Sequence, residues 1–269
     1  MKTYNVLGVN DELIGKCSLQ QKKILNEYFL QIQSKLDYPI KNEFFEILDS
    51  KTKEKSGFIK PRDLVHRDGN WHGAIHFHIY CKENNKTSLV FQIRNSNKDT
   101  FPRMIDTAAA GHYLPGEELQ DGLREVEEEI GLKIELQNVI NLGKHRFYFF
   151  QEEKNIKNCE VQDVLLFQSN FPINKYKLQK EELHGIIKIN TDDIIRLFKM
   201  ECNVIDCEEA YIFDETDNLV KRELSITRND FVPCIYDHYF LKTAFITKMI
   251  SNNMHVVENP YDYDVLTYF

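Results

Sequence analysis

Short runs of apolar residues, each bounded by polar turns, dominate the middle of the chain and predict strands. Three of them are rich in aromatic and β-branched residues, at 44–48, 74–80 and 88–94. A polar hairpin loop at 82–87 joins the second run to the third. Residues 105–110 lead into a loop, and further extended segments follow at 133–139, 146–151 and 161–168. The chain therefore predicts a sheet that is built from hairpins and interrupted by few helices.

The beginning of the chain has a helical pattern instead. Ser18 followed by Gln21 is a capping-box signal for a helix start. Apolar residues then recur at helical spacing as far as Leu36. The helix must end before Pro39, because the residue before a proline is pushed out of the helical region. We therefore expect residues 1–40 to form an N-terminal helical extension.

The chain after residue 200 is expected to pack on a main domain at 41–200. A helix at 190–198, capped by Thr191, closes the main domain. An acidic strand at 208–215 and a strand at 219–226 then predict a hairpin. A broad apolar stripe predicts a helix at 230–251. Residues 201–269 are thus expected to be a C-terminal hairpin and helix packed on the main domain.

An acidic helix at 119–130 is the element that first suggests chemistry. A loop rich in glycine and proline precedes this helix, and Gly131 is expected to end it. Glu125, Glu128 and Glu129 share one face, where each like-charge pair costs about 0.2–0.5 kcal/mol. The last turn of a helix also prefers cations. A bound Mg²⁺ or Mn²⁺ would reverse this penalty, whereas a merely solvated acidic face is an equally weighted alternative.

Composition narrows the class of protein. The chain has 269 residues and a net charge of −8, so its overall charge does not predict a nucleic-acid polymer or an anionic membrane as partner. Six scattered cysteines without a C-x-x-C pair are typical of reduced thiols in a cytosolic protein. There is no apolar run near eighteen residues and no signal-peptide core. We therefore expect a cytoplasmic protein without a membrane span.

The acidic helix carries a resemblance to a known family. Residues 124–132 read R-E-V-E-E-E-I-G-L, which resembles the second half of the Nudix box, R-E-U-x-E-E-x-G-U. Gly111 and Glu117 match its opening G-x₅-E. Six residues separate Glu117 from Arg124 where the family has seven, so either Glu117 or Glu118 fills the first acidic position. The match covers nearly all fixed positions of a long motif.

The resemblance implies a fold, a reaction and a set of residues. The fold is an α/β/α sandwich with a mixed sheet, and the reaction is hydrolysis of a diphosphate linkage by water. The implied metal ligands are Glu125, Glu128 and Glu129 with Mg²⁺ or Mn²⁺, and Arg124 orients them by ion pairs. A base must remove a proton from the water. A box glutamate is the first candidate and Glu182 the second, with Glu160 and Glu181 also open.

A second segment is similar to a Nudix subgroup related to isopentenyl-diphosphate isomerase. It spans residues 65–74, V-H-R-D-G-N-W-H-G-A. The isomerase holds a metal with three histidines and two glutamates. His72 and His112 match two of these histidines, His66 approximates the third, and Glu160 matches one glutamate, so Glu160 is also a candidate metal ligand. Ala110 replaces the catalytic cysteine and cannot transfer a proton, which favours a hydrolase over an isomerase.

The candidate substrate contacts lie before and within the box. Arg94, Lys98, Arg103 and His112 could contact a small diphosphate substrate of the nucleoside-diphosphate type. Isolated basic residues are also commonly solvated surface cations. Three hypotheses follow: a metal-dependent Nudix hydrolase, an isomerase of allylic diphosphates, and a non-catalytic module that binds a nucleotide. A homodimer is a further possible partnership, since this fold often dimerises in the family.

Overall fold

The computed structural model describes residues 2–233 and 238–262. It shows a mixed α and β fold with a large mixed sheet. The chain divides into two compact units. Unit 1 comprises Met1–Ile75, Gly111–Gly122 and Lys144–Asp163, and unit 2 comprises His76–Ala110, Leu123–Gly143 and Val164–Phe269. No described helix is long and apolar enough to cross a membrane. The domain boundaries expected at residues 40 and 200 stay predictions.

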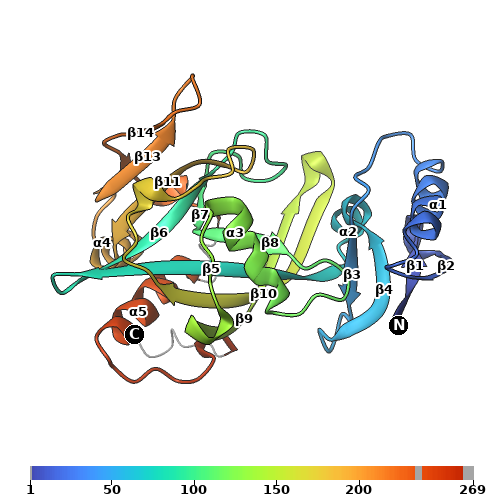
Figure 1. Ribbon diagram of the computed structural model, residues 1–269, viewed down its shortest axis with the longest axis horizontal. Coiled ribbons are helices and arrows are strands. Elements are labelled where there is room, and N and C mark those ends of the chain that lie inside the picture. Colours follow the sequence, from blue (N-terminus) through green and yellow to red (C-terminus); the bar gives the residue numbers. More distant parts are fainter. Residues whose placement is uncertain (1, 234–237, 263–269) are drawn as a thin grey trace. The chain divides into compact units, whose positions relative to one another are not determined.

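Unit 1 is built on one run of strands in the order β2-β1-β4-β3-β5. These strands are β2 (Leu13–Ser18), β1 (Thr3–Leu7), β4 (Lys55–Pro61), β3 (Phe44–Leu48) and the beginning of β5 (Trp71–Glu83). Helix α1 (Lys22–Gln33) covers the first two strands through Phe29 and Ile32 (Figure 1). Helix α2 (Arg62–Asp68) packs on β3 and β4.

The N-terminal helix is present, but two strands precede it that the sequence pattern did not predict. Tyr4 and Val6 alternate with more exposed neighbours, which is the period of a half-buried strand. The expected capping box is half formed. The Ser18 amide donates to Gln21 Oε1 at 2.8 Å, while the buried Ser18 Oγ finds no partner among the described residues and Gln21 stands at the N-cap.

Unit 2 is organised around the strand order β14-β13-β11-β6-β5, with β7 beside β6. Its strands are β6 (Lys86–Arg94), β7 (Ile105–Thr107), β11 (Leu183–Asn190), β13 (Glu209–Phe213) and β14 (Leu219–Lys221). Three predicted strands, at 44–48, 74–80 and 88–94, are confirmed. The β5–β6 turn is tighter than expected, because Asn84 and Asn85 adopt positive φ and pair Glu83 with Lys86.

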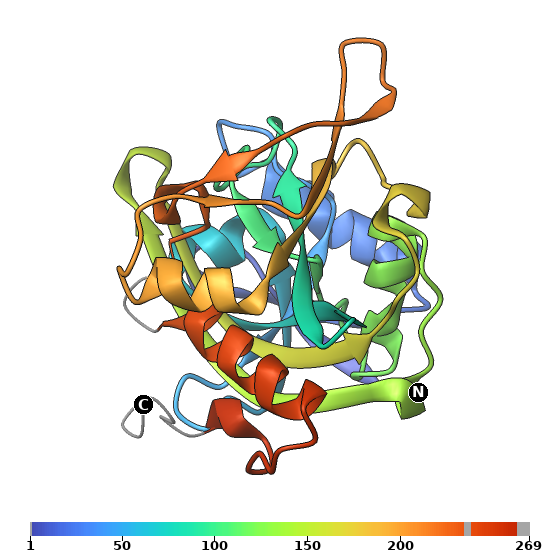
Figure 2. The same cartoon turned by 90° about the vertical axis from the view of Figure 1, so that its left-hand side faces the viewer.

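Two helices of unit 2 pack against each other and on β6. They are α4 (Thr191–Phe198) and α5 (Tyr239–Ser251) (Figure 2). The α4 cap is Asn190, whose side chain accepts from the Asp192 amide, so the prediction of Thr191 as the cap was wrong. The Tyr239 hydroxyl fixes the start of α5, since it lies 2.9 Å from a ring nitrogen of each of His76 and His78.

Three predicted elements differ from those observed. Residues 133–139 are an irregular segment with a 3-10 turn at Leu136–Asn138, and strand β9 begins only at Val139. The helix predicted at 230–251 begins at Tyr239, and residues 234–237 of that prediction lie outside the described part. The strand predicted at 219–226 is split into β14 and β15 (Ser225–Ile226), and β15 pairs with β12 (Ile205–Asp206).

Strands β9 (Val139–Gln151) and β10 (Ile156–Gln168) pair with each other, as the extended segments at 146–151 and 161–168 predicted. Their connection contains a short 3-10 turn at Glu152–Lys154 and ends on Asn155 with positive φ. The loop end of this hairpin, Lys144–Asp163, belongs to unit 1. Strand β8 (Ala109–His112) leads from unit 2 into the loop that precedes the acidic helix.

The acidic helix α3 (Arg124–Ile130) is shorter than the predicted twelve residues. A tight turn shortens it: the Glu118 amide donates to Asp121 Oδ2, and a 3-10 turn follows at Asp121–Leu123. The predicted end is confirmed, because Gly131 adopts φ +72° and its amide bonds the Glu127 carbonyl at 3.0 Å. The helix is therefore a single tight segment that presents all its glutamates within two turns.

Replacing Gly131 by alanine should destabilise the protein more than the same change at Gly57. Both glycines have positive φ, +72° and +77°, so alanine at either position would be strained by about 1–2 kcal/mol in the left-handed conformation. At Gly131 the new Cβ would also lie 2.6 Å from Lys177 Cβ, whereas at Gly57 nothing lies within 4 Å. Urea unfolding of the two variants measures the difference. Equal losses of unfolding free energy would contradict the proposed contact.

Candidate functional site

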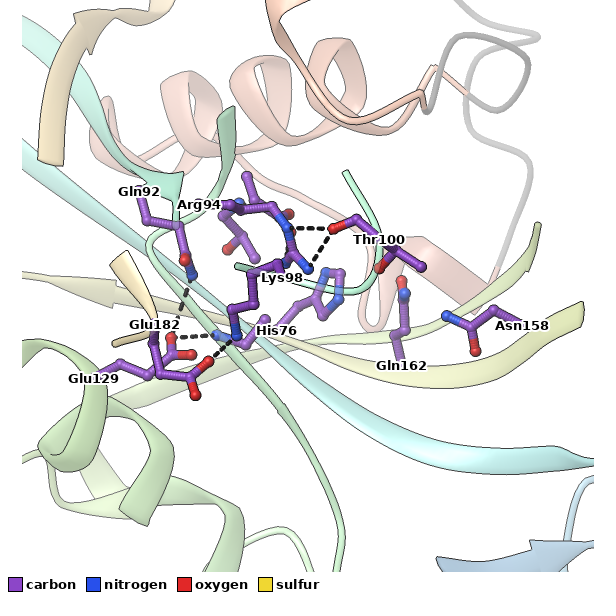
Figure 3. Close-up of polar contacts among 12 residues, drawn as sticks. His76, Gln92, Arg94, Lys98, Thr100, Glu129, Asn158, Gln162 and Glu182 are labelled. Carbon is purple, nitrogen blue, oxygen red and sulfur yellow. Dashed lines mark hydrogen bonds and ion pairs between the residues drawn. The ribbon is translucent and has the colours of Figure 1, made fainter. Parts of the chain in front are cut away.

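The end of helix α3 lies where three segments of unit 2 meet. The Gln179 amide bonds the Glu129 carbonyl at 2.8 Å, and the Lys177 amide bonds the Ile130 carbonyl at 3.0 Å. The Asn95 amide, just after β6, bonds the Glu182 carbonyl at 2.9 Å. These backbone bonds hold the segment before β11 against both α3 and the end of β6. Figure 3 shows the result, with Gln92 and Lys98 directed toward the carboxylates of Glu129 and Glu182.

Glu129 is the buried acid of this group. Its side chain accepts hydrogen bonds from Gln92 Nε2 at 3.2 Å and from the Ala110 backbone amide at 3.1 Å. Burial raises the pKa of the Glu129 carboxyl to about 7, although the charges of Lys98 and Arg94 and the Ala110 amide act to lower it. A carboxyl that titrates near neutral pH can both accept and return a proton. The arrangement therefore suits a general base.

Arg124 forms ion pairs with the other two carboxylates of the box, Glu125 and Glu128. Its Nη1 lies 2.7 Å from Glu125 Oε1 and 3.2 Å from Glu128 Oε2, so the ion pairs implied by the resemblance are present. Glu128 remains 55% exposed, whereas Glu125 is largely covered. The like-charge repulsion expected on this helix is thus offset by an arginine on its first turn. Two carboxylates already converge on one positive charge, and carboxylate oxygens are the donors that Mg²⁺ and Mn²⁺ prefer.

The three cationic residues of unit 2 that were predicted to contact the substrate have different surroundings. Lys98 forms an ion pair with Glu182 and so lies at the carboxylate group. Arg94 closes the loop after β6, since it bonds Asp106 Oδ2 at 3.0 Å and the Thr100 carbonyl at 3.1 Å. Arg103 is exposed in that loop with positive φ. Of these three cations, Lys98 is therefore the one beside the acidic residues.

Three histidines of unit 1 form a second group. One ring nitrogen of each of His66, His72 and His112 lies within 4.8 Å of the others. Gly69, with φ +72°, ends α2 and turns the chain so that His66 faces His72 at the start of β5. The Phe45 ring packs against all three imidazoles.

Two of the histidines, His66 and His72, are held in their neutral form. Burial, together with the neighbouring imidazoles, lowers the pKa of His66 to about 2 and that of His72 to about 4. His72 Nδ1 lies 3.0 Å from the Asn70 carbonyl and donates to it, which leaves a lone pair on Nε2. Neutral imidazole with an oriented lone pair is the form that binds a metal.

Glu160 adds a carboxylate to the histidine group. Its Oε1 lies 3.0 Å from His112 Nε2 and 3.9 Å from His72 Nε2. Asn158 Nδ2 and Gln162 Nε2 each donate to it at 2.6 Å, and Gln162 in turn contacts His145. The buried Asn158 Oδ1 has no hydrogen-bond partner in the described part of the chain. Polar residues at alternate positions of β10 thus complete a site in which one lining atom, Asn158 Oδ1, still lacks a hydrogen-bond donor among the described residues.

The structure therefore sorts the predicted residues into two groups, each within one unit. Glu125, Glu128, Glu129, Lys98 and Glu182 belong to unit 2, and His112 and Glu160 belong to unit 1. Sequence reasoning missed Gln92, Gln162 and His145, because amides and a histidine inside strands carry no motif. The signal that could have found them is a polar residue at a position expected to be buried.

Comparison with known proteins gives the family. No family model matches the chain. The chain is 33% identical over 202 residues to an uncharacterized Nudix hydrolase of Clostridium acetobutylicum, a match that covers 74% of this chain and 95% of that protein. It is 35% identical over 151 residues to Nudix hydrolase 3 of Arabidopsis thaliana, where the match covers 54% of this chain and 19% of the larger protein.

Two solved structures also resemble it at low identity. A MutT/nudix family protein from Enterococcus faecalis has 13% identity and a TM-score of 0.40, and the match covers 93% of this chain and 80% of that one. A protein from Deinococcus radiodurans has 14% identity and a TM-score of 0.43, with 59% and 90% covered. On the identity to the Clostridium relative along nearly its whole length, the chain belongs to the Nudix hydrolases, enzymes that hydrolyse pyrophosphate bonds.

Proposed function

We propose that the protein hydrolyses the diphosphate linkage of a nucleoside-diphosphate-type metabolite by attack of water, with Mg²⁺ or Mn²⁺ as cofactor. The observation that carries the proposal is the group around Glu129, a buried carboxyl whose pKa is raised to about 7 beside Lys98. Glu125 and Glu128 converge on the Arg124 guanidinium close by in the same helix. The residues proposed for acid–base chemistry and for cation binding thus all lie within unit 2.

The residues of the chain divide the work of such a reaction. Glu125, Glu128 and Glu129 would hold the divalent ion, which would neutralise phosphate oxygens and favour deprotonation of water. Glu129 is the first candidate to take the proton of the attacking water, because Gln92 Nε2 and the Ala110 amide both bond its Oε2 and so fix the orientation of the carboxyl group. Glu182 is the second. Lys98, now paired with Glu182, can exchange this partner for a phosphate oxygen of the substrate.

The isomerase and binding-module alternatives have weaker support. An isomerase needs a proton donor at position 110, and the Ala110 side chain has none. What Ala110 supplies is its backbone amide, which donates to Glu129 and so serves the hydrolytic acid. This observation favours the hydrolase over the isomerase.

We also propose that His66, His72, His112 and Glu160 hold a divalent metal of the nitrogen-preferring kind, such as Zn²⁺. The His66 and His72 imidazoles are neutral, the His72 tautomer is fixed by the Asn70 carbonyl, and Asn158 Oδ1 lacks a partner among the described residues. Nitrogen donors suit Zn²⁺, whereas Mg²⁺ prefers oxygen alone. The protein would then carry two metal sites of different chemical preference.

Release of phosphate, pyrophosphate and nucleotide products from a panel of diphosphates tests the proposed reaction. We expect one class, such as nucleoside triphosphates, ADP-ribose, dinucleotides or nucleotide sugars, to be cleaved with Mg²⁺ or Mn²⁺ and spared with chelator. Thiamine diphosphate and isopentenyl diphosphate serve as diphosphates outside the nucleotide class. Conversion of isopentenyl diphosphate to its allylic isomer, with no hydrolysis of the others, would establish the isomerase instead.

Glu128→Gln should remove activity without unfolding the protein. Glu128 is 55% exposed, so the amide costs little stability, but it withdraws one charge from the cation site. A loss of about 100-fold or more in kcat/KM is expected, the scale of a single charge-stabilising group. Glu127→Gln is the matched control, because Glu127 is the neighbouring exposed glutamate and pairs with Lys133. Similar kinetics for the two variants would rule out the assigned role of Glu128.

Titration calorimetry with Zn²⁺ on the metal-free protein tests the histidine site. The native chain should bind one ion with high affinity, and His112→Gln should weaken binding by about 100-fold or more, since even an outer-shell partner is worth about 10–100-fold. His255→Gln, in an exposed segment, is the control histidine. Glu128→Gln should leave this Zn²⁺ affinity unchanged. Undiminished binding by His112→Gln would place the ion elsewhere.

A further inference from the structure

Two histidines of strand β5 share one tyrosine hydroxyl in the interior of unit 2. The Tyr239 Oη atom lies 2.9 Å from His76 Nδ1 and 2.9 Å from His78 Nε2. His78 and Tyr239 are buried, whereas His76 is half-buried. On the far side of its ring, His78 Nδ1 lies 3.4 Å from Thr107 Oγ1, and the Thr107 hydroxyl donates to the Phe77 carbonyl. These contacts form one continuous chain that runs from a backbone carbonyl to His76.

The carbonyl at the end of this chain sets the direction of each hydrogen bond. A carbonyl only accepts, so Thr107 donates its single proton to Phe77 and can only accept from His78. In a neutral ring, His78 Nδ1 then carries the proton and Nε2 carries the lone pair. That lone pair accepts the Tyr239 hydroxyl proton, so the Tyr239 oxygen accepts in turn from His76 Nδ1. The reverse direction would set two acceptors against each other at Thr107, inside a buried chain.

His76 is thereby held in the tautomer that has its lone pair on Nε2. A neutral imidazole of this form accepts a hydrogen bond from an O–H or N–H group through Nε2. It offers no proton there to a phosphate oxygen, which is itself an acceptor. The Lys98 ammonium has the opposite property, because it only donates. The two side chains therefore suit different parts of one molecule, Lys98 a phosphate and His76 an uncharged donor group.

His76 belongs to the unit that contains the Glu129 carboxyl. Its strand, β5, pairs with β8, and the Ala110 amide of β8 bonds Glu129 at 3.1 Å. Figure 3 draws the His76 ring in one close-up with Lys98 and Glu129. Because His76 is half-buried, a molecule bound in this unit has access to part of its ring. Its buried partner Tyr239 has no such access.

We propose that His76 contacts the substrate, accepting through Nε2 a hydrogen bond from an O–H or N–H group of its nucleoside part, and that Tyr239 is the positioning residue that fixes this tautomer. The contact rests on the proposed function, since it needs a nucleoside diphosphate bound in unit 2. Helix α5 then serves the site by presenting Tyr239 to β5.

Nitrogen-15 NMR of the imidazole rings tests the tautomers without any substrate. His76 and His78 should each show a protonated Nδ1 and a bare Nε2, and the loss of signals in His76→Gln and His78→Gln identifies them among the nine histidines. Tyr239→Phe should alter both sets of signals, because it removes the donor to His78 and the acceptor of His76. Tyr148→Phe, at a 64% exposed tyrosine, is the control. A native His76 with a protonated Nε2 would overturn the proposal.

Kinetics with ATP and ADP-ribose test the contact with substrate. His76→Leu should raise KM by about three- to tenfold with kcat little changed, the scale of one neutral hydrogen bond. His76→Gln should keep KM near the native value, because its amide oxygen can take the place of the Nε2 acceptor. Tyr239→Phe should raise KM in the same direction as His76→Leu. His255→Leu, at an exposed histidine, is the matched control and should leave KM unchanged.

Comparison of ATP with 2′,3′-dideoxy-ATP identifies the donor group. A sugar hydroxyl is the donor if the dideoxy compound has a raised KM that His76→Leu does not raise further, and a base N–H is the donor if both nucleotides respond equally to the variant. Native hydrolysis with an unchanged KM in His76→Leu would overturn the contact alone. A native protein that neither binds nor cleaves these nucleotides would overturn the proposed function and the contact together.

Discussion

The burial of the Glu129 carboxyl is the constraint around which unit 2 is arranged. A carboxylate removed from water loses solvation worth several kcal/mol and must be compensated by nearby donors and cations. Three segments provide this compensation: β6 supplies Gln92, β8 supplies the Ala110 amide, and the loop after β6 supplies Lys98. The compensation is incomplete, so the pKa stays near neutral. A bound cation or a substrate phosphate can therefore still shift the protonation of the Glu129 carboxyl.

The histidine group of unit 1 meets the same physical problem in the opposite way. Imidazoles can be buried without charge, and burial lowers the pKa values of His66 and His72 so that both rings stay neutral. Glu160 carries the negative charge there, and two amide side chains and His112 satisfy it. The two groups therefore differ in donor type as well as in place along the chain. Oxygen donors around Arg124 suit a hard cation, while nitrogen donors under Phe45 suit a softer one.

Local signals in the sequence determined much of the candidate site but not its surroundings. The spacing of Glu125, Glu128 and Glu129 and the stop at Gly131 were predictable, because helix periodicity and a left-handed cap depend on neighbouring residues alone. The late start of α3 was not, since it depends on the turn that Asp121 makes with the Glu118 amide. Partners such as Gln92 come from distant strands, and only the three-dimensional fold shows which side chain they meet. Strand β1 was not predicted for the same reason, because its pairing with β4 is non-local.

The β9–β10 hairpin positions the carboxylate of the histidine group. His145 on β9 is buried and contacts Gln162 on β10, which donates to Glu160 in the histidine group. The next residue, Arg146, is exposed. Because alternate residues of one strand point to opposite faces, a shift of one residue in the pairing of β9 with β10 would move His145 to the solvent face and leave Gln162 without this partner. The metal affinity proposed for the histidine group therefore depends on the register of this hairpin as well as on its own side chains.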